Sequence, residues 1–370
     1  MKVCTITCHD VYNHGASLQA YALIEYLKQI GNDVEIIDYK PDYLSGHYKI
    51  ISIDNPKWNK NYITKLTYII LKLPFKLEAL KRKKAFDTFK NKFMSLSKYR
   101  YTSNIQLINN IPKADVYLCG SDQIWNCLRD NGKDPAFYLD FVPDSKIRAS
   151  YAASFATETI DNKYKNFVRE NLLKLDRISV REKSGKKIIN ELELKKVEVV
   201  VDPVFLLDRK IWDDIGNTEF KDKYVLVYDF DNNPIIKKLA LEISHYRRCK
   251  IYTINHYRGS YEDKNFKFSG PETFISLVRN AEFVISNSFH AVAFSLIYKK
   301  PMAIVRRLEN INTRMRDLLI DFNLEHRYIE NDYILDKLLE DIDYAKVDKI
   351  LKAKIISSKN YINEVLSIKK

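Results

Sequence analysis

Apolar runs and helix-spaced apolar residues alternate along the first part of the chain. Residues 2–7 form a short apolar run, residues 18–30 repeat apolar side chains at helical spacing as far as Gly31, and residues 34–39 form a second run. This order predicts a strand, a helix and a strand, which is the βαβ unit of a parallel sheet. Because such sheets bind ligands at the carboxyl ends of their strands, the polar turn at residues 9–15 is a candidate ligand loop.

The same alternation continues through the rest of the chain. Before residue 202, strands are predicted at 114–119, 146–150, 177–180 and 197–201, with a helix at 162–175. After residue 208, strands are predicted at 224–228, 250–254, 283–286 and 302–305, with helices at 235–246, 271–280 and 291–298. The segment DPVFLLD between them indicates a crossing from one domain to the next, with a hinge near Pro203.

These patterns predict an α/β protein with two Rossmann-like domains and a central cleft. We expect the first domain over residues 1–203, the second over residues 204–345, and a last helix over residues 346–370 that packs back toward the first domain. Residues 46–101 are rich in lysine and tyrosine and favour helix, which predicts a helical, basic insertion in the first domain. The length of 370 residues agrees with two domains, since a domain has roughly 150 residues.

The chain is basic, with a formal net charge of +13. This charge suits a polyanionic partner and does not distinguish nucleic acid, anionic lipid headgroups and phosphorylated substrates. The densest basic run is KRKK at residues 81–84, in a stretch where Phe86, Phe89 and Phe93 recur at helical spacing. The run fits the solvated side of an amphipathic helix, and a patch for a membrane surface is the alternative.

The cysteines and the amino-terminal pattern predict a cytoplasmic protein. The five cysteines are odd in number, and no second cysteine or histidine pair joins Cys4 and Cys8 in a zinc site, so we expect no metal. The first residues lack the apolar core and cleavage site of a signal peptide. The apolar stretch at 62–77 is broken by lysines and a proline and falls short of the roughly 20 residues that cross a bilayer. Any membrane contact is therefore expected to be peripheral, at the inner face.

The first candidate loop is NHGAS at residues 13–17. Gly15 lets a ligand approach the backbone closely, and the helix behind it offers free amides to an anion. Asn13, Gly15 and Ser17 are therefore candidate substrate-binding residues. The alternative is an ordinary strand-to-helix turn capped by Ser17.

The second candidate loop, GSDQIWN, follows the apolar run VYLC directly. Asp122 and Asn126 can form hydrogen bonds to sugar hydroxyls, and the indole of Trp125 can stack on a pyranose face unless it lies in the core. The loop position favours a functional role for Asp122, which is a candidate catalytic residue. The candidate substrate-binding residues of this loop are Ser121, Gln123, Trp125 and Asn126.

The third candidate loop, SNSFH, ends at His290, just after the predicted strand at 283–286. A histidine has an unperturbed pKa near 6.5, which suits proton transfer and makes His290 the second candidate catalytic residue. The alternative is a core histidine bonded to a neighbouring carbonyl. Ser288 belongs to the same loop and is a candidate binding residue.

Arginines near strand ends are candidates for binding a phosphate or a carboxylate, because the guanidinium group forms bidentate pairs with both. Arg181 follows the predicted strand at 177–180 and is the strongest of them. For the other arginines, each taken alone, a surface salt bridge is expected; these are Arg306, Arg307, Arg314 and Arg316.

Five motifs in order resemble the polysaccharide pyruvyl transferase family. They are NHGASLQAYAL, GSDQIWN, SVRE, VDPV and SFHAVAFSL with a proline after it, and the resemblance covers roughly residues 3–320. It implies a fold similar to that of the two-domain B-type glycosyltransferases. It also implies phosphoenolpyruvate as donor and co-substrate, no other cofactor, and a saccharide acceptor, often linked to a lipid diphosphate. The reaction would form a ketal in surface polysaccharide (capsule or exopolysaccharide) or cell-wall glycan synthesis.

By this resemblance, Arg181 matches an arginine that holds the donor and His290 matches the histidine of the donor site. One position departs from the pattern: well-studied members carry arginine two residues before that histidine, where this chain has Ser288. If the donor is phosphoenolpyruvate, another cation must face its phosphate, because a buried anion without a partner is disfavoured. We expect Lys299, Lys300 or Arg314 to supply it, with Arg314 favoured for its fork geometry.

Two other functions remain open at this point. The first is a glycosyltransferase that uses a nucleotide-sugar donor in the same cleft. The second is a noncatalytic protein that binds polyanions through its basic charge, although the sequence has no recognised nucleic-acid motif and nucleic acid is not an expected partner.

Overall fold

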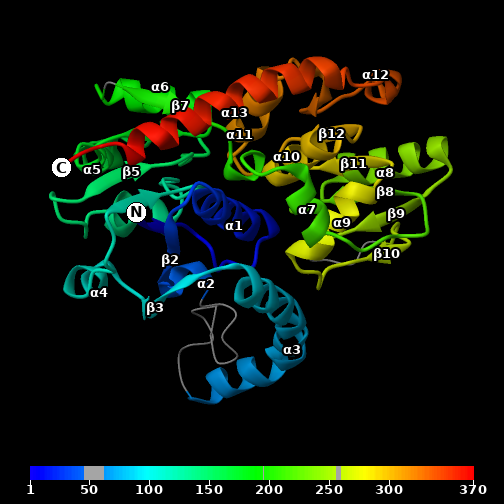
Figure 1. Ribbon diagram of the computed structural model, residues 1–370. Helices are drawn as coiled ribbons and strands as arrows, with labels where there is room; N and C mark the ends of the chain where they lie inside the picture. The colour runs from blue at the N-terminus through cyan, green and yellow to red at the C-terminus, as the bar shows by residue number, and fades with distance from the viewer. Residues whose placement is uncertain (46–61, 195, 256–259) are drawn as a thin grey trace.

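The computed structural model describes residues 1–45, 62–194, 196–255 and 260–370. In this part of the chain, two parallel β-sheets lie side by side with helices on their faces (Figure 1). The first sheet has the strand order β3-β2-β1-β4-β5, and the second has the order β10-β9-β8-β11-β12-β13. The predicted α/β class and the two Rossmann-like units are therefore confirmed.

The strands of the first sheet are β1 (Lys2–Ile6), β2 (Asp33–Tyr39), β3 (Leu96–Tyr101), β4 (Val116–Cys119) and β5 (Ile147–Ser150). The strands of the second sheet are β8 (Tyr224–Tyr228), β9 (Lys250–Thr253), β10 (Lys264–Asn265), β11 (Phe283–Ser286), β12 (Met302–Val305) and β13 (Tyr328–Ile329). A third small sheet pairs β6 (Ile178–Val180) with β7 (Val197–Val199) and is joined to the first sheet through the bridge between Ala149 and Arg177.

The α-helices are α1 (His14–Gln29), α2 (Asp42–Ser45), α3 (Tyr62–Phe93), α4 (Asn104–Asn109), α5 (Asn162–Leu172), α6 (Lys183–Glu191), α7 (Arg209–Ile215), α8 (Pro234–Arg247), α9 (Pro271–Asn280), α10 (Phe289–Tyr298), α11 (Thr313–Asp321), α12 (Leu335–Leu339) and α13 (Tyr344–Leu366). Short 3-10 helices lie at η3 (Asp130–Lys133), η4 (Pro135–Tyr138), η5 (Pro203–Phe205) and η6 (Glu325–Arg327). Among the described residues, no helix is long and apolar enough to span a membrane.

The central strands are buried on both faces, as their continuous apolar sequences predict. Val3 on β1 pairs with Val34 on β2 and with Val116 on β4, all in parallel register. In the second sheet β8 and β11 occupy the equivalent central positions, with Phe283 paired to Val225. In each sheet two neighbouring central strands therefore send their following loops toward the same edge.

The predicted basic insertion differs from the structure in its last part. Residues 96–101 are not helical but form β3, an edge strand that pairs with β2. The sequence LSKYRY has a mixed polar pattern because an edge strand is only partly buried, so it carries no clear apolar signal. Residues 46–61 of the predicted insertion lie outside the described residues. The strands β10 and β13 have two residues each and are too short to leave a readable pattern.

One apolar core joins the two sheets, in addition to a separate core in each half of the molecule. Tyr21 on α1 packs edge-on against Trp212 on α7, and Trp212 packs in the same way against Phe294 on α10, at ring distances of 5.8 and 5.0 Å. All three side chains belong to a single buried cluster that includes residues of both sheets. The side chains between the two sheets therefore form a packed apolar core.

The last helix, α13, crosses back from the second sheet to the first (Figure 1). The Tyr361 hydroxyl donates to the Ser150 carbonyl at 2.8 Å, and Ser358 Oγ accepts from the Val201 amide at 2.9 Å. Near its end, Glu364 pairs with Arg177. These contacts attach the end of the chain to the small sheet and to β5. The exact domain boundary at residue 203 stays a prediction.

Candidate active site

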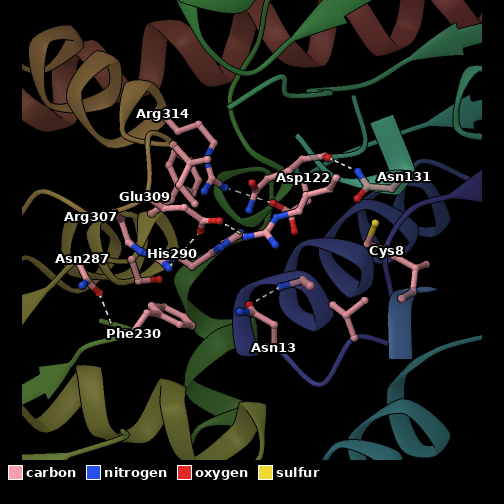
Figure 2. Close-up of a pocket in the computed structure, with 18 residues that line it drawn as sticks. Cys8, Asn13, Asp122, Asn131, Phe230, Asn287, His290, Arg307, Glu309 and Arg314 are labelled. Atoms are coloured by element: carbon pink, nitrogen blue, oxygen red, sulfur yellow. Dashed lines mark hydrogen bonds and ion pairs between the residues drawn. The ribbon is translucent and has the colours of Figure 1, made fainter. Parts of the chain in front are cut away.

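A pocket with a volume of 240 Å³ lies between the two sheets (Figure 2). Its described lining residues come from the loops after β1, β4, β8, β11 and β12, and from α2, α1, α10 and α11. The strands β1 and β4, and likewise β8 and β11, are neighbours from which the chain winds in opposite directions. Such switch points are where open α/β sheets bind their ligands. All three candidate loops of the sequence contribute to this pocket.

Asp122 lines the pocket from the loop after β4. The loop turns at Gly120, which has φ +122 and whose missing Cβ would lie 2.1 Å from the Tyr151 carbonyl oxygen, so only glycine fits there. The Asp122 carboxylate faces two arginines, with Arg181 Nη2 at 3.3 Å and Arg314 Nη1 at 3.4 Å from Oδ1. Figure 2 shows Asp122 and Arg314 approaching each other from opposite walls.

Arg181 stands behind the pocket and links two carboxylates. Its Nη1 lies 2.5 Å from Asp202 Oδ2, its Nη2 reaches Asp122, and its guanidinium carbon lies 4.1 Å from the ring of Phe289. The side chain is 2% exposed and is not among the described residues that line the pocket. The positive charge of Arg181 is thus already paired with the carboxylates of Asp202 and Asp122. Arg181 can act on a ligand through Asp122, as a positioning residue.

His290 lies at the first turn of α10 and lines the pocket. Its Nε2 is 3.6 Å from Asp202 Oδ2, beyond hydrogen-bond distance, and has no hydrogen-bond partner in the part of the chain that the structure describes. The other side of the ring touches Gly15 on α1: a Cβ on Gly15 would lie 1.9 Å from His290 Nδ1. The glycine of the first loop therefore makes room for the histidine of the third.

Asp202 joins these groups from the crossing between the domains. Ser121 Oγ lies 3.2 Å from Asp202 Oδ2, the same oxygen that Arg181 approaches, and the Val204 amide donates to Oδ1. Burial acts to raise the pKa of Asp202, but His290 and then Arg181 outweigh it and hold the pKa below its usual range. Asp202 is therefore ionised at neutral pH.

Asp122 is ionised for the same reason. Burial acts to raise its pKa, while the charges of Arg181 and then Arg314 lower it by more, so the pKa lies below the ordinary value. Arg314 is affected in the opposite direction: burial, followed by the nearby charge of Arg181, lowers its pKa to about 10, so it still carries its charge at neutral pH. Two carboxylates and two guanidinium groups thus balance one another beside His290.

Three arginines line the pocket, and each has an acidic partner. Arg307 binds Asp231 through Nε and Nη2 at 3.0–3.1 Å, and Arg129 pairs with Glu309, another lining residue. For Arg314, Asp122 is the nearest acid at 3.4 Å, and its buried Nε has no hydrogen-bond partner among the described residues. Arg314 is therefore the pocket cation best able to take a further anion.

The amino ends of two helices point into the pocket from opposite sheets. At α1, Asn13 Oδ1 accepts from the Ala16 amide at 3.2 Å, so the cap of this helix is Asn13 and not Ser17. At α10, Ser288 occupies the cap position and its side chain makes no capping hydrogen bond. Both Asn13 and Ser288 line the pocket. Helix amino ends carry partial positive charge, so both favour an anion between them.

The sequence matches the polysaccharide pyruvyl transferase family over residues 13–309. The chain belongs to this family. The members of this family are enzymes, and their reaction needs a pyruvyl donor and a saccharide acceptor. No curated protein matches the sequence.

Solved structures of UDP-N-acetylglucosamine 2-epimerases have a similar fold. The enzyme from Rickettsia bellii has a TM-score of 0.54 at 11% identity and covers 99% of this chain and 96% of its own. A putative epimerase from Listeria monocytogenes has a TM-score of 0.52 at 12% identity, covering 96% and 89%. The enzyme from Methanocaldococcus jannaschii, in complex with UDP-GlcNAc and UDP, has a TM-score of 0.51 at 15% identity, covering 95% and 93%. At such low identity the likeness shows the fold alone, and the predicted resemblance to the B-type glycosyltransferase fold is confirmed.

The family motifs do not all reach the pocket. Asp122 and Gln123 line it, whereas Trp125 is fully buried, stacks on Tyr138 and donates its indole N–H to the Phe137 carbonyl at 3.0 Å. The structure therefore supports the core alternative for Trp125, whose ring has no open face for a sugar. Asn126 is also buried, and its side chain bonds to Gln123 Oε1 and the Leu128 amide.

The lysines proposed to replace the missing arginine lie at the other end of α10. Lys299 pairs with Asp348 on α13 at 2.6 Å, and Lys300 follows the carboxyl end of the helix, while Ser288 and His290 are at its amino end. Neither lysine is among the described lining residues, and Arg314 is the one of the three that lines the pocket. Ser17 and Ser121 are buried behind the pocket wall.

Sequence reasoning missed several residues of the site. The sequence indicates only a domain crossing at Asp202, yet its carboxylate lies within 3.6 Å of Arg181, Ser121 and His290. The aspartate before a proline in VDPV could have signalled a helix cap, which it also is. The other unassigned lining residues include Cys8, Arg129, Asn131, Phe230, Asn287 and Glu309. Among the described residues, no cluster of three or more histidines, cysteines or acids is arranged to hold a metal ion.

Replacing Gly15 by alanine tests whether the histidine has to occupy its present position. The added Cβ would lie 1.9 Å from His290 Nδ1, so the ring must move, while alanine at this helical position favours α1. We expect a drop in activity of about 10-fold or more with little loss of thermal stability. A double variant with His290→Ala should be no worse than His290→Ala alone. Full activity of Gly15→Ala would contradict this arrangement.

Proposed function

We propose that this protein transfers a pyruvyl group from phosphoenolpyruvate to two hydroxyls of a saccharide, with loss of phosphate. One observation carries the proposal. In this member of the pyruvyl transferase family, a histidine, a cation and the amino ends of two helices all line the same pocket. The donor carries a phosphate and a carboxylate, and this set of positive groups suits both.

In the proposed binding mode, Arg314 takes the place of the arginine that Ser288 lacks. Arg314 is a buried cation whose Nε has no hydrogen-bond partner in the described chain, and it enters the pocket near the Ser288 end of α10. Asp122 lies 3.4 Å from Arg314, which is longer than the usual charge-assisted hydrogen bond of about 2.7–2.9 Å. The guanidinium group can therefore bind a closer anion.

The chemistry requires one proton for the methylene carbon of the donor. In the proposal His290 gives that proton, which makes the neighbouring carbon cationic, and a sugar hydroxyl bonds to this carbon and loses its own proton. A second hydroxyl then displaces the phosphate, so that a methyl group, a ketal and inorganic phosphate result. Asp202, ionised and with Oδ2 3.6 Å from His290 Nε2, places a negative charge beside the imidazole in this step.

Asp122 is the candidate base for the sugar. Its pKa lies below the ordinary range, so it is a carboxylate at neutral pH and accepts hydrogen bonds from hydroxyls. It cannot serve as the acid, because it carries no proton there. In the proposal His290 therefore donates the proton, and Asp122 orients the acceptor.

The proposed acceptor is a precursor of a surface polysaccharide or a cell-wall glycan, such as one carried on a lipid diphosphate. Such an acceptor would place the reaction in the cytoplasm at the inner face of the membrane. The family supports a saccharide acceptor, and the basic charge of +13 suits an acceptor or carrier that is itself anionic.

Ligand-induced stabilisation separates the three functions considered for the chain. Binding of phosphoenolpyruvate should raise the Tm, with no comparable shift from UDP-GlcNAc. A shift with UDP-GlcNAc alone would favour a glycosyltransferase. A shift with neither, together with strongly salt-dependent DNA binding, would favour a polyanion-binding protein. Phosphate release that requires both phosphoenolpyruvate and a member of a saccharide panel would then identify the acceptor.

Replacing Arg314 by glutamine should weaken phosphoenolpyruvate binding about 10- to 100-fold, because a hydrogen bond to a charged group is worth roughly 1.5–3 kcal/mol. Isothermal titration gives the Kd directly. The matched control is Arg316→Gln: Arg316 lies on the same helix but pairs with Glu158 at the surface, so its Kd should not change. An unchanged Kd for Arg314→Gln would remove this residue from the donor site.

A further inference from the structure

One face of the long helix α3 is apolar and exposed. Tyr62, Leu66, Ile70, Leu73 and Leu77 follow one another at intervals of four, four, three and four residues, which places them along one side of the helix. We call these five residues the α3 stripe. Their exposed fractions run from 37% to 81%. Large apolar side chains that are exposed singly are common, but a continuous stripe of this kind marks a site of interaction.

The stripe lies on the part of α3 that projects from the body of the protein. Figure 1 shows the first half of the helix lying away from both sheets and its second half rising toward them. On the opposite side of the helix Tyr68 is 7% exposed and Leu71 is 59% exposed, so exposed apolar residues are not confined to the stripe but are continuous along it. In the second half, Phe86 and Phe89 are buried in the body.

The second half of α3 fixes the helix to both halves of the molecule. Arg82 is buried, and it donates to the Tyr12 carbonyl beside the first pocket loop and to the Lys267 carbonyl before α9, both at 3.0 Å. Part of the KRKK run is thus a structural anchor and not a solvated face. The helix that carries the stripe is therefore attached, in its second half, beside the first pocket loop.

The charge of α3 indicates what the stripe binds. Within residues 62–93 there are nine lysines and arginines and two acidic residues. Lys65 and Lys72 flank the stripe on one side, and Lys81 and Lys84 continue as exposed basic residues toward the body. A basic helix with an apolar face suits an anionic lipid surface, into which the apolar side chains insert while lysines meet the headgroups. A second copy of this chain is a poor partner, because it would bring two equally basic helices together.

We propose that the α3 stripe inserts into the surface of an anionic lipid bilayer and docks the protein there as a peripheral protein. The inference does not depend on the pyruvyl transfer reaction, because no residue of the stripe lines the pocket. It would stand if the donor proved to be another compound.

Vesicle sedimentation with the full-length protein, in the absence of donor and acceptor, tests the proposal. The protein should sediment with vesicles that contain phosphatidylglycerol, should bind vesicles of phosphatidylcholine alone at least about 10-fold more weakly, and should lose binding as salt rises. The triple variant Leu66→Ser, Ile70→Ser, Leu73→Ser should reduce the partition coefficient by about 10-fold or more, because each side chain contributes buried apolar surface.

Matched variants distinguish the stripe from general surface effects. The apolar control is Leu173→Ser, Leu241→Ser, Ile356→Ser, three residues exposed by 46% to 60% on other helices or their ends. The charge variant Lys65→Gln, Lys72→Gln should weaken binding to the phosphatidylglycerol vesicles, and its control Lys163→Gln, Lys346→Gln should not. Light scattering gives the oligomeric state of each protein.

Three results would overturn the proposal. They are equal binding to the two vesicle types, equal loss of binding in the apolar control and the stripe variant, and a dimer that the stripe variant converts to a monomer. The last would assign the stripe to contact between copies of the chain. The stripe variant should retain the wild-type Tm shift with phosphoenolpyruvate, so failure of docking and failure of the proposed reaction are separate outcomes.

Discussion

Replacing His290 by alanine should lower pyruvyl transfer by about 10²- to 10⁴-fold, the usual contribution of a general acid or base. The fold should persist, because His290 Nε2 has no hydrogen-bond partner in the described chain and alanine suits the first turn of α10. The measurement is the rate of phosphate release from phosphoenolpyruvate with the acceptor found in the saccharide panel. Affinity for phosphoenolpyruvate should change much less than the rate.

The control for this experiment is His245→Ala, at an exposed histidine in the last turn of α8, which should leave both rate and Tm unchanged. A folded His290→Ala protein with near-normal turnover would show that another group donates the proton. A large fall in Tm would instead show that the histidine is needed for the packing between α10 and Gly15.

Replacing Arg181 by alanine should destabilise the protein by about 3–5 kcal/mol, the usual cost of removing one partner of a buried ion pair. The variant leaves the buried carboxylate of Asp202 without its guanidinium partner and leaves Asp122 with Arg314 alone. This expectation differs from that of an arginine that holds the donor directly, for which the sequence predicts a loss of affinity in a stable protein. Urea unfolding measures the free energy.

The matched control is Arg177→Ala, an arginine of the same segment that is 30% exposed and pairs with Glu198 and Glu364. A surface pair of this kind contributes about 0–1 kcal/mol. Adding Asp202→Asn to Arg181→Ala should recover part of the lost stability, because it removes one of the uncompensated charges. A stable Arg181→Ala protein whose only defect is donor affinity would restore the direct donor role.

The positions of the strands and the three pocket loops are predictable from the sequence. Buried parallel strands such as β8, β11 and β12 are continuous apolar runs, and each is bounded by polar residues, so their ends are clear. Residues directly after such ends, like Asp122 and His290, face the cleft because the sheet directs them there. For Asp122 and His290, the apolar run before each residue is enough to predict that the residue lies at the cleft.

The direction and partners of a side chain are less predictable. Trp125 follows a strand as closely as Asp122 does, but its large ring is buried against Tyr138, and nothing in the local sequence distinguishes these outcomes. Arg181 and Arg314 are both arginines near strand ends, but of the two only Arg181 has Asp202 beside it. That proximity comes from the packing of segments far apart in the chain, which a single sequence does not record.

The position of Asp202 on the crossing has a consequence for how such proteins diverge. Its carboxylate approaches Arg181 and Ser121 of the first half and His290 of the second, so the electrostatic balance of the site belongs to neither half alone. Recombination between family members near residue 202 would pair a crossing from one parent with a histidine helix from the other. Only parents that share this carboxylate and the glycine opposite the histidine would reproduce this arrangement of side chains. The two halves therefore depend on each other for this arrangement, although each has its own sheet.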